Sequence, residues 1–312
     1  MKKILLTVTL VVLAMMVVAQ TQLKDYYIPK KGDWAVGITF NPATLYSQRL
    51  SMQPDAGDFA GDYVAGLALN PKQMFILSQD PLAAIRFKYH LNECAAFRTT
   101  LGINGSLVNY REYVRDDYAF ALDPNTQNKV IDMATSSYNS VTLMLGSEWK
   151  KGNKAVKFVF GVDFMYTIAG GMLNYEYGNK LTELNPVPST MPMMGLEIVG
   201  GVNDFEAQNG LSYARPIKSY HHGYIHGIGL ACDLGLECFV AERLSLGIAL
   251  NFTPIMLAIQ PQTWTVYEGF NTNSGAVVNY NSLISPGSNA LLYGTENVGC
   301  RISLQYYFGK DG

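Results

Sequence analysis

Apolar and polar residues alternate one by one along residues 226–252. Apolar residues occupy every even position in 228–240, and the odd positions 227–237 hold glycine, alanine, Asp233 or Glu237. After a short turn, the alternation continues through 244–252. A period of two residues predicts β-strands, and these two strands are longer than the usual length of about five to six residues.

Each of these strands has one wholly apolar face and one face of small and charged residues. A strand of a soluble sandwich also alternates, but it is shorter, and long solvated side chains cover its polar face. Small residues with a few charges suit a narrow interior, while the apolar face suits lipid. This is the pattern of a transmembrane β-barrel of the outer membrane.

Six further segments show the same alternation, and they are 33–40, 82–91, 95–109, 137–149, 155–168 and 297–308. With the first hairpin they make eight strands, an even number that permits a closed antiparallel barrel. We therefore expect an all-β fold, a closed antiparallel transmembrane β-barrel of eight strands. Ten strands are the alternative, if a hairpin in the first or third long connection joins the wall.

The connections between the strands alternate between short and long. Short turns lie near residues 92, 151 and 242, and the long connections are 41–81, 110–136, 169–223 and 260–294. Outer-membrane barrels show this asymmetry, with short periplasmic turns and long extracellular loops. Segments 263–268 and 276–280 also alternate, which predicts that strands continue above the membrane.

The first residues have the character of a secretory signal peptide. Two lysines precede an apolar run from Ile4 to Val18, and Ala19 provides a small residue for cleavage. This run is short for a spanning helix, and no stop-transfer charge cluster follows it. We expect a signal peptide at 1–19, a single barrel domain at 20–312, and localisation in the outer membrane of a Gram-negative bacterium.

In these features the chain resembles the small eight-stranded outer-membrane barrels of the outer-membrane protein A and X type. The resemblance covers roughly residues 20–310 and rests on the signal peptide, the alternation, the loop asymmetry and the near-terminal aromatic Phe308. Such barrels present a terminal aromatic residue to the assembly machinery. The chain departs from the type in its tail after Phe308 and in its larger loops.

Composition and charge fit an exported barrel. Charged residues make up 15% of the chain and the net charge is −2, which gives no electrostatic basis for binding nucleic acid. The four cysteines are Cys94, Cys232, Cys238 and Cys300. Cys232 and Cys238 share a strand face about 20 Å apart, too far for a bridge that needs Cα atoms within about 7 Å. We expect all four to be unpaired.

Several charges fall on the inward faces of the strands. Those expected to form a structural network in the lumen are Arg86, Lys88, Arg98, Glu148, Asp163, Asp233, Glu237 and Arg301, with His90 and Lys157 beside them. Counting from the periplasmic turns places Arg98 in a lower tier and both aspartates near the middle. Asp163 and Asp233 would repel each other, so we expect Arg301 or Arg86 to bridge them and to close the barrel. Separately hydrated charges in a wet lumen are the alternative.

Three candidate sites of other chemistry are weaker. His221, His222 and His226 cluster near the end of the third loop, where a metal site would also need a supporting carboxylate, and a rim segment rich in amphipathic residues is the alternative. The carboxylates of that loop, Glu197, Asp204 and Glu206, lack the ligand spacing of a calcium loop. Ser212 and Ser219 could partner a histidine in a lipid-modifying enzyme, although nothing fixes their geometry. We expect no catalytic residues, no metal site and no cofactor.

The long connections remain as the place for function, because binding residues concentrate on loops held by a rigid scaffold. We expect a barrel with a plugged lumen that acts as a structural or binding protein. Its binding surface would lie in loops 41–81, 169–223 and 260–294. Expected partners are outer-membrane lipid and another outer-membrane protein, a surface glycan or a host molecule. A small-solute channel and a lipid-modifying outer-membrane enzyme are the alternatives.

Overall fold

A computed structural model describes residues 27–42, 81–152, 156–190, 211–220, 224–295 and 298–309. The predicted signal peptide at 1–19 lies outside these ranges, as does most of the connection 41–81. The candidate ligands of the third loop that also lie outside are His221, His222, Glu197, Asp204 and Glu206.

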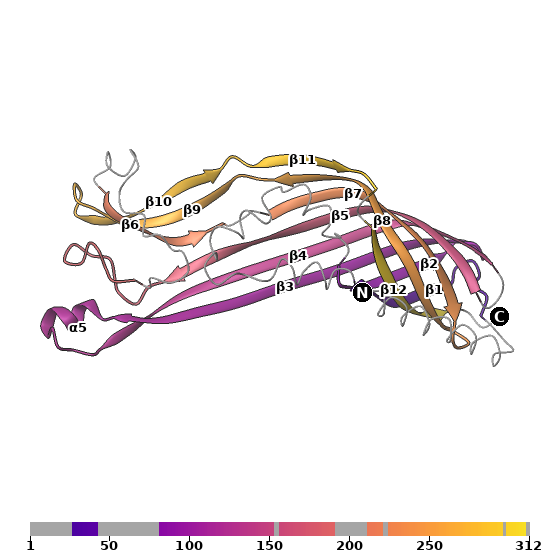
Figure 1. The fold of residues 1–312 in the computed structure, drawn as a ribbon, viewed down its shortest axis with the longest axis horizontal. Coiled ribbons are helices and arrows are strands. Elements are labelled where there is room, and N and C mark those ends of the chain that lie inside the picture. The colour runs from indigo at the N-terminus through magenta and orange to yellow at the C-terminus, as the bar shows by residue number, and fades with distance from the viewer. Residues whose placement is uncertain are drawn as a thin grey trace.

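Eight antiparallel strands close into a ring (Figure 1). They are β1 (Trp34–Phe40), β2 (Ala83–His90), β3 (Ala95–Arg115), β4 (Lys129–Gly152), β5 (Val156–Glu176), β7 (Tyr224–Phe239), β8 (Leu244–Gln260) and β12 (Val298–Phe308). Each strand pairs with the next in this order, and β12 pairs with β1, so that Val36 lies opposite Tyr306. The predicted eight-stranded antiparallel barrel is confirmed, and among the described strands no additional hairpin joins its wall.

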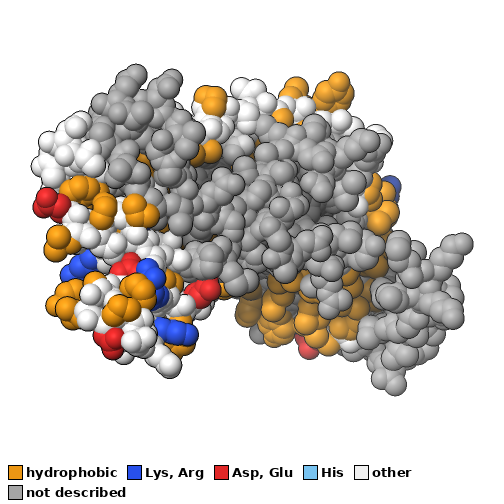
Figure 2. Space-filling view, turned by 60° about the vertical axis from the view of Figure 1, so that its left-hand side comes forward, with side chains coloured by type: hydrophobic (Ala, Val, Ile, Leu, Met, Phe, Trp, Pro, Cys, Tyr) orange, Lys and Arg blue, Asp and Glu red, His pale blue; other side chains and the backbone are white. Residues whose placement is uncertain are grey.

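An apolar belt surrounds the outside of the ring. On β3 the outward apolar residues run from Phe97 to Leu107, and Asn109 and Arg111 follow them. About ten residues at ~3.3 Å each, tilted by about 40°, span about 25 Å, which is the height of the apolar band of such barrels. Figure 2 shows a continuous hydrophobic area on the barrel side of the view, whereas charged and apolar side chains mix at the opposite end.

Aromatic residues gather at the periplasmic rim. Trp34 lies opposite both Tyr89 and Phe308 in the strand register, and its ring meets that of Tyr89 at 5.6 Å between centroids. The rings of Tyr306 and Phe308 are 4.9 Å apart. All four side chains are exposed. They are placed where amphipathic rings meet the lipid headgroups.

The strands continue well beyond this belt. The predicted loop 110–136 consists instead of the ends of β3 and β4, which pair up to Arg115 and Lys129, and the short helix α5 (Asp117–Leu122). The Asp116 side chain caps that helix by accepting a hydrogen bond from the Ala119 N–H at 3.0 Å. Within the described ranges, no helix is long and apolar enough to cross a membrane.

A side sheet extends this part of the molecule. β6 (Leu211–Ser219) pairs with the upper end of β5, β9 (Thr263–Asn271) pairs with β6, and β10 (Ala276–Ser285) pairs with β9. The predicted strands at 263–268 and 276–280 are therefore confirmed. Figure 1 shows β6, β9 and β10 at the end of the molecule away from the barrel.

β8 changes its neighbour at Pro254. Below this residue it pairs with β12, and above it with β11 (Ser288–Tyr293). The Gly294 N–H donates to the Pro254 carbonyl at 3.0 Å, and the register with β7 shifts at the same level. Proline has no N–H for the ladder, so a bulge and a change of partner occur where that donor is missing.

All four cysteines are free, as predicted. Cys94 is exposed, and Cys232 and Cys300 are half-buried. Cys238 is buried, although the alternation placed it on the lipid-facing side. It occupies the penultimate position of β7, where Phe239 and the turn that follows pack against the periplasmic end of the ring.

A polar cluster ties segment 177–190 to the α5 hairpin. The Asp117 carboxylate accepts hydrogen bonds from the Ser189 N–H at 2.6 Å, the Asn185 amide at 3.0 Å and the Arg115 guanidinium at 3.1 Å. Asn179 accepts from the Asp117 N–H and donates to the carbonyls of Arg115 and Ser189. Partial burial acts to raise the pKa of Asp117, but these hydrogen bonds outweigh it and hold the pKa below its usual value.

This cluster should weaken in acid. Because the folded pKa of Asp117 is below the unfolded one, its stabilisation is complete above the unfolded pKa of about 3.9 and is lost as pH falls through the folded pKa. Amide exchange in 177–190, corrected for intrinsic rates, should accelerate below pH ~4. Asp117→Ala should accelerate it already at pH 7, whereas Asp123→Ala, at the other end of α5, should not. Unchanged protection in Asp117→Ala would contradict this account.

Candidate functional site

The strand register places a glycine between the inward charges of neighbouring strands. Arg98 on β3 lies opposite Gly146 on β4, which lies opposite Asp163 on β5. Because Gly146 has no side chain, Arg98 reaches across it to Asp163. The two side chains form a bidentate pair, with Nε–Oδ1 at 2.8 Å and Nη2–Oδ2 at 2.7 Å.

In the next inward row a glycine again separates two charged residues, and here both are carboxylates. Gly161 on β5 lies opposite Glu148 on β4 and Asp233 on β7. The Arg98 guanidinium rests on Gly161, since a Cβ added to that glycine would lie 2.3 Å from Arg98 Nη1. From this position Nη1 contacts Glu148 Oε2 at 3.1 Å and Nη2 contacts Asp233 Oδ2 at 2.9 Å. One arginine therefore joins carboxylates from three strands.

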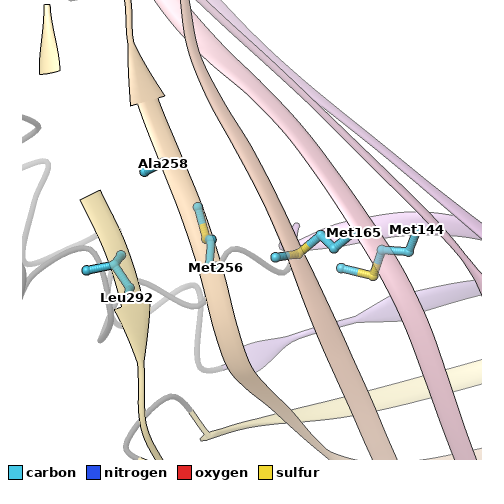
Figure 3. Packing of buried hydrophobic residues seen from close by; sticks show 5 residues of the cluster. All are labelled: Met144, Met165, Met256, Ala258 and Leu292. Carbon is cyan, nitrogen blue, oxygen red and sulfur yellow. The ribbon is translucent and has the colours of Figure 1, made fainter. Parts of the chain in front are cut away.

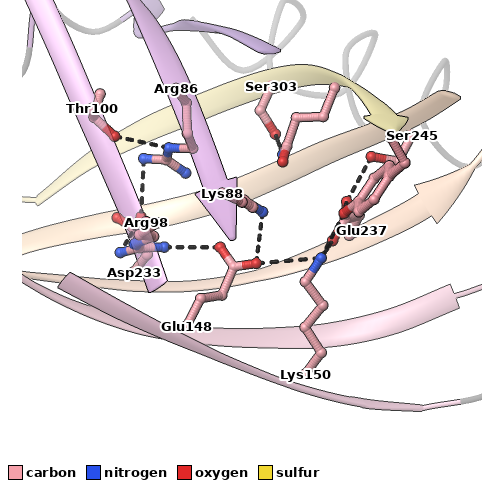
Figure 4. Close-up of polar contacts among 12 residues, drawn as sticks. Arg86, Lys88, Arg98, Thr100, Glu148, Lys150, Asp233, Glu237, Ser245 and Ser303 are labelled. Carbon is pink, nitrogen blue, oxygen red and sulfur yellow. Dashed lines mark hydrogen bonds and ion pairs between the residues drawn. The ribbon is translucent and has the colours of Figure 1, made fainter. Parts of the chain in front are cut away.

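Cations from the opposite wall complete this centre (Figure 4). Arg301 Nη1 lies 2.5 Å from Asp233 Oδ2, and Arg86 Nη2 lies 3.5 Å from the same oxygen. Lys88 Nζ contacts Glu148 Oε1 at 2.6 Å. These side chains are at most 4% exposed, so the charges depend on one another rather than on bulk water.

A second centre lies closer to the periplasm. Lys150 Nζ contacts Glu237 Oε2 at 2.5 Å and Glu148 Oε1 at 3.4 Å, and it donates a hydrogen bond to the Tyr307 hydroxyl at 2.6 Å. The Tyr307 hydroxyl donates to Glu237, which also accepts from the Ser245 hydroxyl at 2.6 Å. Lys150 links the two centres, because it contacts a carboxylate of each.

An aromatic floor lies beneath these charges. The Tyr307 ring packs against Phe239 at 5.2 Å, Tyr27 at 5.8 Å and His90 at 5.6 Å between centroids. Tyr27 precedes the first strand, and its hydroxyl donates to Asp33 at 2.5 Å. Tyr27 thus packs beneath the periplasmic end of the barrel, where its N–H also donates to the Glu242 carbonyl.

A cluster of methionines lies in the lumen above the charges (Figure 3). Met144, Met165 and Met256 project inward from β4, β5 and β8 and pack with Ala258 and Leu292. All five are buried. Arg301 Nη2 lies 3.8 Å from the Met144 sulfur, so the two layers are in direct contact. The interior therefore consists of an aromatic floor, a charged layer and a methionine layer.

The eight predicted network charges are all buried, and each forms at least one ion pair with another of them or with Lys150. They are Arg86, Lys88, Arg98, Glu148, Asp163, Asp233, Glu237 and Arg301. The predicted bridge between the aspartates needs correction. Arg98 forms it, because Gly146 and Gly161 let its long side chain reach the middle tier. Both arginines predicted for this role, Arg86 and Arg301, contact Asp233.

Sequence reasoning missed two members of the site. Lys150 was placed in a turn, but it continues the inward alternation of Gly146 and Glu148, and β4 extends to Gly152. Tyr307 lies between the outward residues Tyr306 and Phe308, so the same alternation assigns it to the lumen. In both cases the two-residue period of the strand assigns the side chain to the lumen.

The other candidate chemistry finds no assembled site in the part of the chain that the structure describes. There, no three His, Cys, Asp or Glu side chains come together as a potential metal site. His226 lies on the outer face and its Nδ1 is 2.8 Å from the Tyr166 hydroxyl. Ser219 instead forms a hydrogen bond with Thr265.

The fold is that of a small eight-stranded outer-membrane β-barrel, the type predicted from the sequence. No known family model matches the chain, and no curated protein sequence matches it. Among solved structures, it is similar to the crystal structure of the outer membrane protein OprG from Pseudomonas aeruginosa. The match has 11% sequence identity and a TM-score of 0.33, and it covers 92% of this chain and 99% of that chain.

Removing Arg98 should destabilise the barrel strongly. Arg98→Met keeps an unbranched side chain but leaves Asp163 without its bidentate partner, and breaking a buried ion pair typically costs about 3–5 kcal/mol. Urea unfolding of refolded protein in detergent measures this loss. Arg115→Met is the matched control, because its pair with Asp117 is half-exposed and should contribute less than about 1 kcal/mol.

A glycine variant tests the same geometry without removing a charge. Gly161→Ala places a methyl group where the Arg98 guanidinium lies, which should cost about 1–3 kcal/mol through displacement of that side chain. Gly105→Ala is the control, because its added Cβ would first meet the Asn139 side chain. Equal stability of Gly161→Ala and wild type would show that the Arg98 guanidinium does not lie against Gly161.

Proposed function

We propose that this protein is an outer-membrane barrel with a plugged lumen, which acts as a structural or binding protein through its extracellular extension. The observation that carries the proposal is the buried ion network that crosses the lumen and joins six strands of its wall through Lys88, Arg98, Glu148, Asp163, Asp233 and Arg301. The apolar belt and the predicted signal peptide support the location in the outer membrane.

The dimensions of the barrel support a plug. The interior of an eight-stranded barrel is just wide enough for side chains to fill it. Here three successive layers fill it, and Arg98, Met165 and Tyr307, one from each layer, are at most 1% exposed. A hydrated ion would have to displace paired charges and then cross an apolar layer.

The extracellular extension supports a binding role. It is a folded unit of paired strands, capped by α5 and held to segment 177–190 by the Asp117 cluster. Its far end exposes apolar side chains, which include Tyr113, Tyr118, Leu122, Leu184 and Val187. Apolar groups that stay exposed above the membrane mark interaction surfaces, because lipid does not cover them.

Planar bilayer recordings test the plug. Wild-type protein should give no steady conductance, because the three layers leave no continuous water path. Arg98→Ala, which removes the largest fully buried side chain, should give more frequent openings than wild type. The exterior variant Arg111→Ala should remain silent. Steady wild-type conductance would show that the lumen is an open pore, and the small-solute channel would replace this proposal.

A further inference from the structure

β10 forms one border of the sheet. It pairs with β9, and no other described strand pairs with it. None of its ten residues is buried, and Val277 and Leu283 are 44% and 68% exposed. A border strand offers a row of backbone donors and acceptors on its outer side, which a further strand can use.

The residues of β10 lack the features that usually protect such a border. Native border strands carry charges or proline, or are very short, and these features prevent pairing with other chains. Residues 276–285 contain no charged residue, no proline and no glycine. The strand is also longer than the usual length of about five to six residues. Nothing in its composition therefore opposes the addition of a strand.

The more exposed face of β10 has a symmetric pattern. Its residues in order are Val277, Asn279, Asn281 and Leu283, so an apolar residue stands at each end and two amides stand between them. In an antiparallel pair of identical strands, the axis is perpendicular to the sheet and opposite residues share a face. An axis at position 280 sets Val277 opposite Leu283 of the second copy and Asn279 opposite Asn281.

We propose that β10 pairs antiparallel with β10 of a second copy of this chain, an inference that rests on the proposed binding role of the extracellular extension. Each apolar residue then meets an apolar residue, and each amide meets an amide that can accept and donate hydrogen bonds. The pairing is isologous, because the same segment of both copies forms both sides of the contact.

The direction of β10 determines how the two barrels are placed. β10 follows the long axis of the molecule, and the barrel lies at the other end of that axis (Figure 1). A twofold axis perpendicular to β10 therefore turns the two barrels in opposite directions. This contact joins proteins in two membranes that face each other, and it connects one cell surface to another.

The size of the contact determines its strength. Ten residues on each side are fewer than the roughly 20–30 of a standard stable interface, so a single pair should dissociate readily. Two facing membranes carry many copies, and the pairs then act together. Self-association should therefore be weak in detergent and strong between vesicles.

The test uses the full mature protein in phosphatidylcholine vesicles, with vesicle aggregation followed by light scattering at low salt. Wild-type vesicles should aggregate. Val277→Lys/Leu283→Lys places lysine opposite lysine, and Val277→Glu/Leu283→Glu places glutamate opposite glutamate, so vesicles of either variant alone should lose aggregation at least tenfold. A one-to-one mixture of the two vesicle populations should regain it, because lysine then faces glutamate.

Heat-modifiable gel migration confirms that each variant is folded, and both substituted positions are exposed in the monomer. Three results would overturn the inference. Wild-type vesicles could fail to aggregate, the lysine variant could aggregate like wild type, or the mixture could stay dispersed. None of these results bears on the bilayer recordings, so failure of this contact and failure of the plugged lumen are distinguishable.

Discussion

The narrow interior of an eight-stranded ring is the constraint on which the structure depends. Charges that face such an interior cannot keep their water, so each needs a partner across the lumen. Long side chains reach those partners only where the intervening strand has no side chain. Gly146 and Gly161 provide that space, and the small inward residues are therefore as necessary to the network as Arg98 itself.

The three layers of the lumen follow from the same constraint. Tyr307 combines an aromatic body, which packs on the floor, with a hydroxyl that joins the charged centre above it. Met144 packs among the other methionines and touches Arg301. Flexible methionine side chains suit the irregular space at the level where β11 replaces β12 beside β8.

The sequence was sufficient for the ring, because every wall strand alternates over the height of the apolar belt. The sequence was insufficient where the two faces of a strand no longer differ in polarity. The ends of β3 and β4 carry polar residues on both faces, as in Thr135 and Ser136, so the alternation there predicts a loop instead of strands. The strand register alone could not identify the arginine that bridges Asp163 and Asp233. An arginine side chain is long enough to reach beyond the row of residues directly opposite it. Arg98 was counted at the height of its Cα and acts a tier higher.

Tyr27 also links the aromatic floor to the closure of the ring. The floor needs Tyr307, which belongs to the last strand, and Tyr27, which precedes the first. These residues come together only when β1 and β12 pair. The floor is therefore complete only when β1 and β12 are paired. A chain trapped before closure would expose its charged layer to periplasmic water, and ring closure seals that layer from below.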